Sequence, residues 1–177
     1  MDRAARLAAL LPAAPRDEVL NYYDSLGPVA PEAILGLWKG EELATGHAYD
    51  GLLGPSGWWG KAFRSVDDVD PLVFERRGKR FAGNPGLMPL GLIERAPGLA
   101  KSGMSAALFR ALSPLLRTGK SRARLRPVDY RGVTSAAMVY DQLPIIDCFR
   151  RVDDDTLLGA MDIRGFADPY FFVLRRA

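Results

Sequence analysis

Tryptophan and glycine alternate through residues 36–63, and this stretch constrains the fold more than any other part of the chain. It holds all three tryptophans (Trp38, Trp58 and Trp59) and the only histidine, His47. Tryptophan needs a large apolar pocket and a partner for its N–H, whereas glycine allows sharp turns and close backbone contact because it has no Cβ. A curved sheet uses both, since aromatic rings fill the space that glycines leave. We therefore expect this stretch to belong to a tightly curved β-sheet.

The chain has 177 residues, which is enough for one domain with an apolar core. Its shares of 48% hydrophobic and 25% charged residues are typical of a soluble globular protein, and a single cysteine excludes an internal disulfide network. No apolar run reaches the length that spans a bilayer, and Pro12 and Pro15 interrupt the one near the N-terminus. We expect a cytoplasmic protein that can also bind peripherally to the inner face of the membrane.

Helical spacing of apolar residues predicts helices at residues 2–11 and 16–26. A third, amphipathic helix is expected around residues 102–116, with Pro114 ending or bending it. Its apolar face would carry Met104, Leu108, Leu112 and Leu115.

Short strands separated by turn residues account for most of the remaining chain. Residues 71–82 read as a hairpin around Arg77-Gly78-Lys79, and several short strands follow between residues 125 and 177. Such spacing predicts a mainly β fold with N-terminal helices, in which an antiparallel meander closes as a barrel or sandwich. We expect one domain over residues 1–177, made of these parts: N-terminal helices (1–35), the first barrel part (36–98), the helix with a basic connection (99–124) and the C-terminal strands (125–177).

Several short motifs give the sequence a specific resemblance. They are Gly36-Leu-Trp38-Lys-Gly40, Thr45-Gly46-His47, Gly57-Trp-Trp-Gly-Lys61-Ala-Phe63, Tyr140-Asp-Gln-Leu-Pro-Ile-Ile-Asp147, Phe149-Arg150, Asp153-Asp154 and Leu158-Gly-Ala-Met-Asp162. Together they resemble the bacterial two-part family with a GXWXG domain followed by a DUF4334 domain, over nearly the whole chain. The family name carries little chemistry. A histidine is common in the family before the Phe-Arg pair, where this chain has Cys148.

A weaker resemblance concerns the fold. The G-x-W element is similar to the opening of lipocalins and fatty-acid-binding proteins, which implies an antiparallel calycin-like β-barrel with a helical insertion around residues 102–116. In those barrels the tryptophan packs across the closed end near a basic residue of a late strand. Trp38 would take this position here, with Arg150, Arg164, Arg175 or Arg176 as the cation.

A barrel of this size encloses space for one apolar ligand. The residues expected to bind it are Trp38, His47, Trp58, Trp59, Lys61, Phe63, Tyr140, Asp147, Phe149 and Arg150. Alternation in the strand 145–152 puts Asp147 on one face with Ile145 and Phe149. A carboxylate on an apolar face needs a partner, for which His47 or a neighbour of Arg150 is a candidate. Asp147 is therefore either structural or the polar end of a pocket.

An enzyme is the main alternative to a binding protein. His47 could serve as acid or base on a hydrophobic substrate, with Asp147 or Asp141 orienting it, or be a hydrogen-bonded turn residue. Cys148 reads as a core residue within a strand, and no G-x-S-x-G motif occurs. Neither a metal nor a cofactor is expected, since one histidine and one cysteine do not make the usual ligand set and Asp153–Asp155 reads as an acidic turn.

Positive charge is concentrated between residues 101 and 131, which hold eight Lys and Arg residues and one acid, Asp129. Together with the predicted amphipathic helix, this segment suggests a portal or membrane-facing surface made of Met104, Leu108, Leu112, Arg110, Arg117 and Lys120. Nucleic acid is an improbable partner because few aromatic residues accompany the cations.

The leading hypothesis is thus binding of a hydrophobic small molecule, such as a fatty acid or another lipid, inside the barrel. The alternatives are the enzyme described above and a scaffold protein with a filled barrel.

Overall fold

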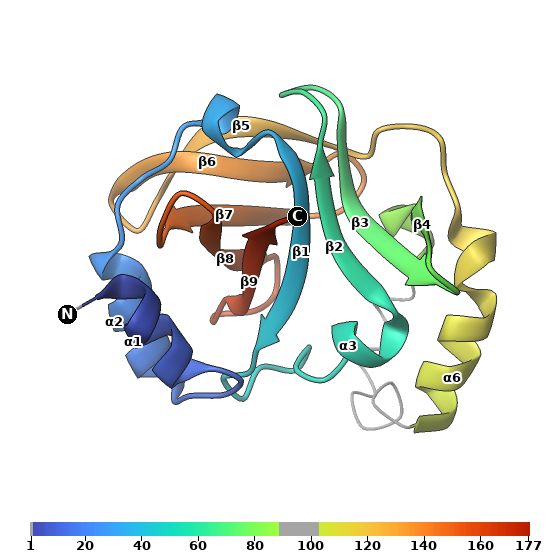
Figure 1. The fold of residues 1–177 in the computed structure, drawn as a ribbon, viewed down its shortest axis with the longest axis horizontal. Coiled ribbons are helices and arrows are strands. Elements are labelled where there is room, and N and C mark those ends of the chain that lie inside the picture. The colour runs from blue at the N-terminus through green and yellow to red at the C-terminus, as the bar shows by residue number, and fades with distance from the viewer. Residues whose placement is uncertain (1, 89–102) are drawn as a thin grey trace.

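The computed structural model describes residues 2–88 and 103–177 (Figure 1). The helical elements are α1 (Arg3–Leu10), α2 (Arg16–Ser25), η1 (Pro31–Ile34), α3 (Leu53–Ser56), η2 (Pro85–Leu87), α6 (Gly103–Leu112) and η3 (Ser113–Leu116). The strands are β1 (Gly36–Leu43), β2 (Trp58–Phe63), β3 (Val69–Arg76), β4 (Lys79–Ala82), β5 (Ala123–Tyr130), β6 (Val133–Tyr140), β7 (Ile145–Arg151), β8 (Thr156–Ile163) and β9 (Tyr170–Arg176). The expected boundary at residues 98–99 lies outside the described residues.

One antiparallel sheet curves into a closed barrel. Eight strands form the ring in the order β1, β2, β3, β5, β6, β7, β8 and β9, and β4 extends outward as the hairpin partner of β3. The first and last strands complete the ring, because β1 pairs with β9 from Trp38 opposite Arg176 to Leu43 opposite Phe171. Apart from β4, each strand therefore pairs with its neighbours in the sequence. The predicted mainly β, antiparallel barrel is confirmed.

Aromatic rings occupy the space left by glycines inside the barrel, as the alternation in the sequence predicts. A Cβ on Gly40 would lie 2.0 Å from Cη2 of Trp58, so the six-membered ring of the indole occupies the space of the missing side chain. In the same way, a Cβ on Gly159 would lie 2.4 Å from Cζ of Phe172. These glycines let large rings fill the interior without widening the ring of strands.

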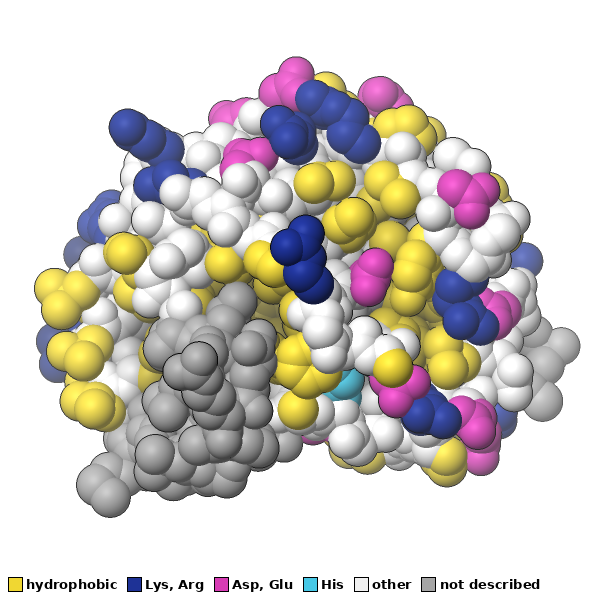
Figure 2. All heavy atoms as spheres, turned by 180° about the vertical axis from the view of Figure 1, so that it is seen from behind, with side chains coloured by type: hydrophobic (Ala, Val, Ile, Leu, Met, Phe, Trp, Pro, Cys, Tyr) yellow, Lys and Arg dark blue, Asp and Glu magenta, His cyan; other side chains and the backbone are white. Residues whose placement is uncertain are grey.

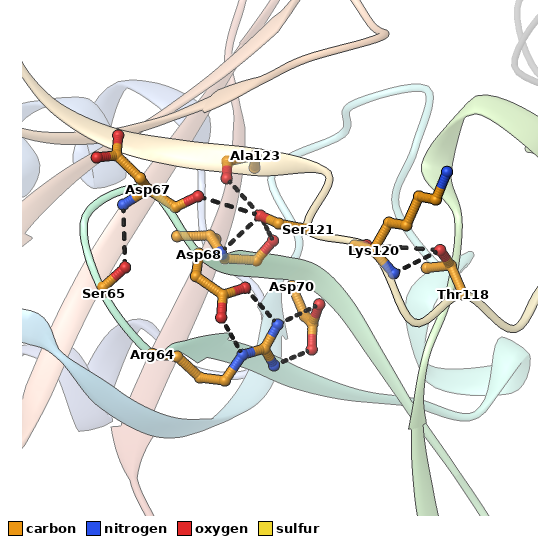
Figure 3. Close-up of polar contacts among 10 residues, drawn as sticks. Arg64, Ser65, Asp67, Asp68, Asp70, Thr118, Lys120, Ser121 and Ala123 are labelled. Carbon is orange, nitrogen blue, oxygen red and sulfur yellow. Dashed lines mark hydrogen bonds and ion pairs between the residues drawn. The ribbon is translucent and has the colours of Figure 1, made fainter.

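The ring is joined most sparsely between β3 and β5, whose ladder consists of the single pair Val69 and Ala123. Side chains reinforce this seam (Figure 3). Oγ of Ser121 accepts a hydrogen bond from the Val69 amide at 2.9 Å and lies 3.1 Å from the Val69 carbonyl oxygen. Just before β3, the Arg64 guanidinium donates to both Asp68 and Asp70 and holds the connecting turn. Local side-chain bonds therefore replace part of the missing ladder.

The N-terminal helices cover the outer wall of the barrel. Apolar residues of α1 and α2 pack on outward-facing side chains of β8 and β9, including Leu158, Ala160, Phe171 and Val173. The end of the barrel is covered instead by the short η1, because Ile34 joins the interior cluster beside Trp38.

The helical insertion forms α6, and η3 begins just before Pro114, which confirms the predicted early end of the helix. It lies on the side of the barrel opposite α1 and α2 (Figure 1). Phe109 anchors α6 to the sheet, since its ring centroid is 6.0 Å from that of Phe74 on β3. Within the described residues, no helix is long and apolar enough to span a bilayer.

Candidate binding site in the barrel interior

A bulge in β2 decides which side chains enter the barrel. The pairing of β2 with β3 shifts register on both sides of Gly60, so that Trp58, Lys61 and Phe63 all face inward while Trp59 faces outward. Gly60 has φ +156°, and a Cβ there would lie 1.9 Å from the carbonyl oxygen of Trp38. Only glycine fits this approach, and the bulge it allows turns Lys61 into the core.

Lys61 and Asp147 form an ion pair in the interior. Nζ of Lys61 lies 2.7 Å from Oδ2 of Asp147, and the two side chains are only 3% and 0% exposed. Nζ also donates to the carbonyl oxygen of Pro71 at 3.2 Å and lies 4.8 Å from the ring centroid of Phe172. The hydroxyl of Tyr140 lies 3.5 Å from the same Asp147 oxygen. The partner of Asp147 is therefore Lys61, and not His47 or a neighbour of Arg150.

Burying the Lys61–Asp147 pair costs free energy, because both charged groups lose their contact with water. Burial raises the pKa of Asp147 above its ordinary value, although the nearby Lys61 ammonium acts in the opposite direction. Burial and the Asp147 charge likewise raise the pKa of Tyr140. Buried ion pairs often contribute little net stability compared with apolar residues of similar size. Stability alone is thus a weak reason for a lysine and an aspartate at these positions.

Two polar atoms beside the pair have no hydrogen-bond partner among the described residues. They are Oδ1 of Asp147, which accepts, and Nε1 of Trp58, which donates. The Trp58 ring centroid lies 5.8 Å from Nζ of Lys61, so this indole packs near the pair. Most buried polar groups in proteins are paired, and those that are not call for an explanation such as a bound water or ligand.

One end of the barrel is closed. Its interior side chains, among them Phe63, Phe149, Leu157 and Leu174, are at most 1% exposed. Trp38 donates from Nε1 to the carbonyl oxygen of Ile34 at 2.7 Å, and the Arg176 guanidinium stacks on its ring at 4.4 Å. Of the four arginines proposed as partners of Trp38, the structure selects Arg176.

The other end is less tightly sealed. Interior side chains nearer this end keep some contact with solvent, for example 8% of Trp58 and 7% each of Leu72 and Tyr140. Partly buried apolar residues surround the end and pack on the interior cluster: Ala48, Leu52, Leu53, Phe81, Phe109, Leu143, Met161 and Phe166. The rim at this end is therefore apolar and less deeply buried than the closed end.

His47 lies at this rim and apart from the pair. Its Nδ1 accepts a hydrogen bond from the Tyr49 amide at 3.1 Å, and its ring packs against Phe166 and Tyr170. It also borders an open surface pocket of about 410 Å³ that Arg16 and Asp168 line. The carboxylates expected to orient it are engaged elsewhere. Asp147 binds Lys61, and Asp141 forms an ion pair with Arg124 at 3.6 Å.

Two of the expected binding residues point away from the interior. Trp59 packs outside the barrel under Arg80, whose guanidinium carbon is 3.8 Å from the indole centroid. Arg150 faces the layer beneath α2, where it lies 5.0 Å from the Tyr23 ring and donates to the Tyr130 carbonyl oxygen at 2.8 Å. Their inclusion among residues lining a barrel pocket was therefore wrong. The strand period already put Arg150 opposite Asp147, and only the bulge places Trp59 outside.

Cys148 belongs to the same outer layer as Arg150 and is buried. Burial raises the pKa of its thiol to about 12, which agrees with a structural role and not with a nucleophile. The acidic residues Asp153–Asp155 form the turn between β7 and β8, where Asp155 pairs with Arg176 at 3.1 Å. Among the described residues, no group of three or more His, Cys, Asp or Glu side chains is arranged to hold a metal ion.

Sequence reasoning missed several interior residues near the rim. The hydroxyl of Tyr170 donates to Oε2 of Glu42 at 3.0 Å, and the Gly51 amide donates to the other oxygen of Glu42. Phe172 lies closest of the aromatic rings to the Lys61 ammonium. The two-residue period of the last strand, which puts Tyr170 and Phe172 on one face, was the available signal.

The residues expected at a portal or membrane surface lie outside the barrel. Leu108 and Leu112 on α6 are exposed, as are Arg110, Arg117 and Lys120. The side chain of Met104 lies outside the described part of the chain.

Comparisons with known proteins agree with the fold. Residues 21–79 match the family described as "GXWXG protein", and residues 121–176 match "Domain of unknown function (DUF4334)". A crystal structure of a protein from Thermomonospora curvata is similar over 100% of this chain and 99% of that one, with 34% sequence identity and a TM-score of 0.74. No curated protein matches the sequence.

Proposed function

The chain belongs to the GXWXG/DUF4334 family, and on that premise we propose that its barrel binds a hydrophobic small molecule whose polar end meets the Lys61–Asp147 pair. The observation that carries the proposal is the two unsatisfied polar atoms, Oδ1 of Asp147 and Nε1 of Trp58, in an interior made mostly of apolar side chains. A ligand gains from such atoms because each removes an unpaired buried group on binding.

The charge of the site narrows the class of ligand. Lys61 is already neutralised by Asp147, and the open positions are one acceptor and one donor. A group that both donates and accepts, such as a hydroxyl, offers the kind of partner that each atom lacks. A fatty-acid carboxylate satisfies only the indole and brings a second negative charge towards Asp147, which is unfavourable at low dielectric. We therefore favour a long-chain alcohol or another neutral, hydroxyl-bearing lipid over a fatty-acid anion.

The apolar part of the ligand would lie towards the rim. Leu72, Ile145, Met161 and Phe166 provide contact surface there, and the closed end beyond Phe149 leaves the chain no other exit. Each buried methylene contributes about 0.8 kcal/mol, so affinity is expected to rise with chain length until the rim is passed.

The experiment begins with native mass spectrometry of freshly purified protein, which detects a co-purified lipid directly. Stripped protein is then titrated by calorimetry with a long-chain alcohol, the fatty acid of the same length and the alkane. We expect the alcohol to bind best.

Trp58→Phe removes the indole N–H and should weaken alcohol binding about tenfold, the equivalent of one hydrogen bond. Trp59→Phe is the matched control, since this indole lies outside the barrel, and should leave affinity unchanged. No uptake of any ligand would show a filled scaffold instead of a carrier. Equal effects of the two variants would show that the ligand does not bind at the Trp58 indole.

A further inference from the structure

The large hydrophobic side chains that the described residues expose gather on one side of the molecule. They are Leu87, Leu108, Leu112 and Leu115, with exposures of 57%, 59%, 48% and 76%. Three of them follow helical spacing along α6 and η3, and Leu87 on η2 lies beside them because the Asn84 amide donates to the Leu116 carbonyl oxygen at 2.7 Å. Figure 2 shows hydrophobic side chains at its left edge, over the position of α6. We refer to these four leucines as the leucine patch.

A basic pocket adjoins the leucine patch. Its volume is about 450 Å³, and it is lined by Arg76, Arg77, Lys79, Phe81, Pro114 and Arg117. Pro114 lies in the sequence between Leu112 and Leu115, so the pocket and the patch share a border. Within the described chain, none of the four cations forms an ion pair; the Arg76 guanidinium donates to the Ala111 carbonyl oxygen at 3.2 Å.

The basic segment of residues 101–131 is thus divided in two. On β5 and its following turn, Arg124, Arg126 and Arg131 pair with Asp141, Asp67 and Asp24. The other cations of this segment that the structure describes, Arg110, Arg117, Lys120 and Arg122, form no ion pair with a described residue. Arg110 lies on α6, and Arg117 lines the basic pocket with the cations of the β3–β4 hairpin. Uncompensated cations therefore occur where the exposed leucines are.

We propose that the leucine patch and the basic pocket dock the protein on an anionic bilayer. Leucine side chains of an interfacial helix insert at the boundary of headgroups and acyl chains, while neighbouring cations meet lipid phosphates. The phosphates of a nucleic acid would bind the cations but would leave the exposed leucines in water. An anionic bilayer binds the cations through its headgroups and the leucines through its acyl chains. The contact of Phe109 with Phe74 places this docking face on the flank of the ligand barrel.

Flotation with vesicles tests the proposal on the full chain. The wild type should float with vesicles of phosphatidylcholine and phosphatidylglycerol but not with phosphatidylcholine alone, and added salt should release it. Each surface cation contributes about fivefold to the partition coefficient. Reversing two in Lys79→Glu/Arg117→Glu should lower partitioning by more than about tenfold.

Leu112→Gln/Leu115→Gln should also lose binding without losing its fold, because both side chains are exposed. The matched charge control is Arg3→Glu/Lys39→Glu, two exposed cations elsewhere, and it should float as the wild type does. Thermal melts followed by circular dichroism check that each variant is folded. If the double variant melts at a lower temperature than the wild type, the single variant Leu115→Gln replaces it in the flotation experiment.

Three results would overturn the proposal. The first is equal flotation with neutral and anionic vesicles or with neither, and the second is an equal loss in the charge control. The third is a wild-type dimer that Leu112→Gln/Leu115→Gln converts to monomers, since a second copy would then cover the patch. Because calorimetry with soluble ligand involves no vesicles, failure here is distinct from failure of ligand binding.

Discussion

Lys61 and Asp147 meet at 2.7 Å inside the barrel although 86 residues separate them in the chain. The first comes from the bulged strand β2 and the second from β7, so the pair forms only when both halves of the barrel are in place.

Removing one partner of the pair should destabilise the fold strongly. Lys61→Met leaves Asp147 as a buried charge without compensation, which typically costs about 3 to 5 kcal/mol. Urea unfolding measures the loss at pH 7. Lys61→Met combined with Asp147→Leu should recover most of it, since no charge is then buried.

The pH dependence of the same variant has a definite sign. Burial already raises the pKa of Asp147, and removal of the Lys61 ammonium raises it further. The folded variant then holds a proton that the unfolded chain has lost, so its stability should increase as pH falls towards the ordinary pKa of an aspartate. A variant that loses stability on acidification faster than the wild type would contradict this account.

Gly60 should tolerate no side chain. Gly60→Ala puts a Cβ 1.9 Å from the Trp38 carbonyl oxygen at φ +156°, and backbone strain of this kind costs at least about 2 kcal/mol. Gly119→Ala is the control, because a Cβ there meets no atom within 4 Å among the described residues. Thermal melts should show a large fall for the first and almost none for the second; equal melting temperatures would mean that the bulge is not rigid.

The closed end should depend on Arg176 and not on its neighbour. Arg176 stacks on Trp38 and donates to the carbonyl oxygens of Leu35 and Ala33, whereas Arg175 forms one ion pair among the described residues, with Glu41 at 3.8 Å. Arg176→Gln should therefore lower the free energy of unfolding by about 1 to 2 kcal/mol, and Arg175→Gln by less than about 0.5 kcal/mol. Chemical denaturation of the two variants in parallel measures both free energies of unfolding. A larger decrease in Arg175→Gln than in Arg176→Gln would mean that Arg176 is not the residue that stabilises the closed end.

Cys148 should react only in the unfolded chain. Its thiol pKa is raised to about 12 by burial, so thiolate stays scarce in the folded protein where an ordinary cysteine would ionise. Labelling with a thiol reagent at pH 8 should be slow and should accelerate with urea in step with unfolding. Stability should also fall as pH rises from about 9 towards 12, because the unfolded chain loses this proton first. Cys148→Ala should show a shallower fall, and rapid labelling of the native protein would be inconsistent with the buried position.

The barrel and its helices could be predicted because their signals are local. Turn residues, strand periods and helical spacing act over a few residues, and the motifs Gly36-Leu-Trp38-Lys-Gly40 and Gly57–Phe63 specify ring-on-glycine packing. Asp147 was placed correctly on the apolar face by the alternation in its strand. The contact of Trp38 with an arginine of a late strand could also be predicted, from the resemblance to lipocalins. The choice among the four candidate arginines needed the register of β1 with β9.

The partner of Asp147 could not be derived in the same way. The shift at Gly60 puts Lys61 on the same face as Trp58, three residues before it, which no strict two-residue period allows. That shift depends on the close approach of β1, a contact between strands that the sequence does not display. A strict two-residue period likewise puts Trp59 on the face of Lys61, and only the shift at Gly60 turns Trp59 outward. The position of Arg150 needs no such shift, because the period of its strand already puts Arg150 on the face opposite Asp147.

The pairing of β1 with β9 has a consequence for synthesis in the cell. β1 emerges from the ribosome early, but the edge that β9 later covers stays open until nearly the whole described chain has been translated. During that time its backbone is a template for another nascent chain, and the outward charges of Lys39 and Glu41 act as gatekeepers against such pairing. A truncated translation product ending before β9 would keep this edge exposed and become a target for chaperones and proteases.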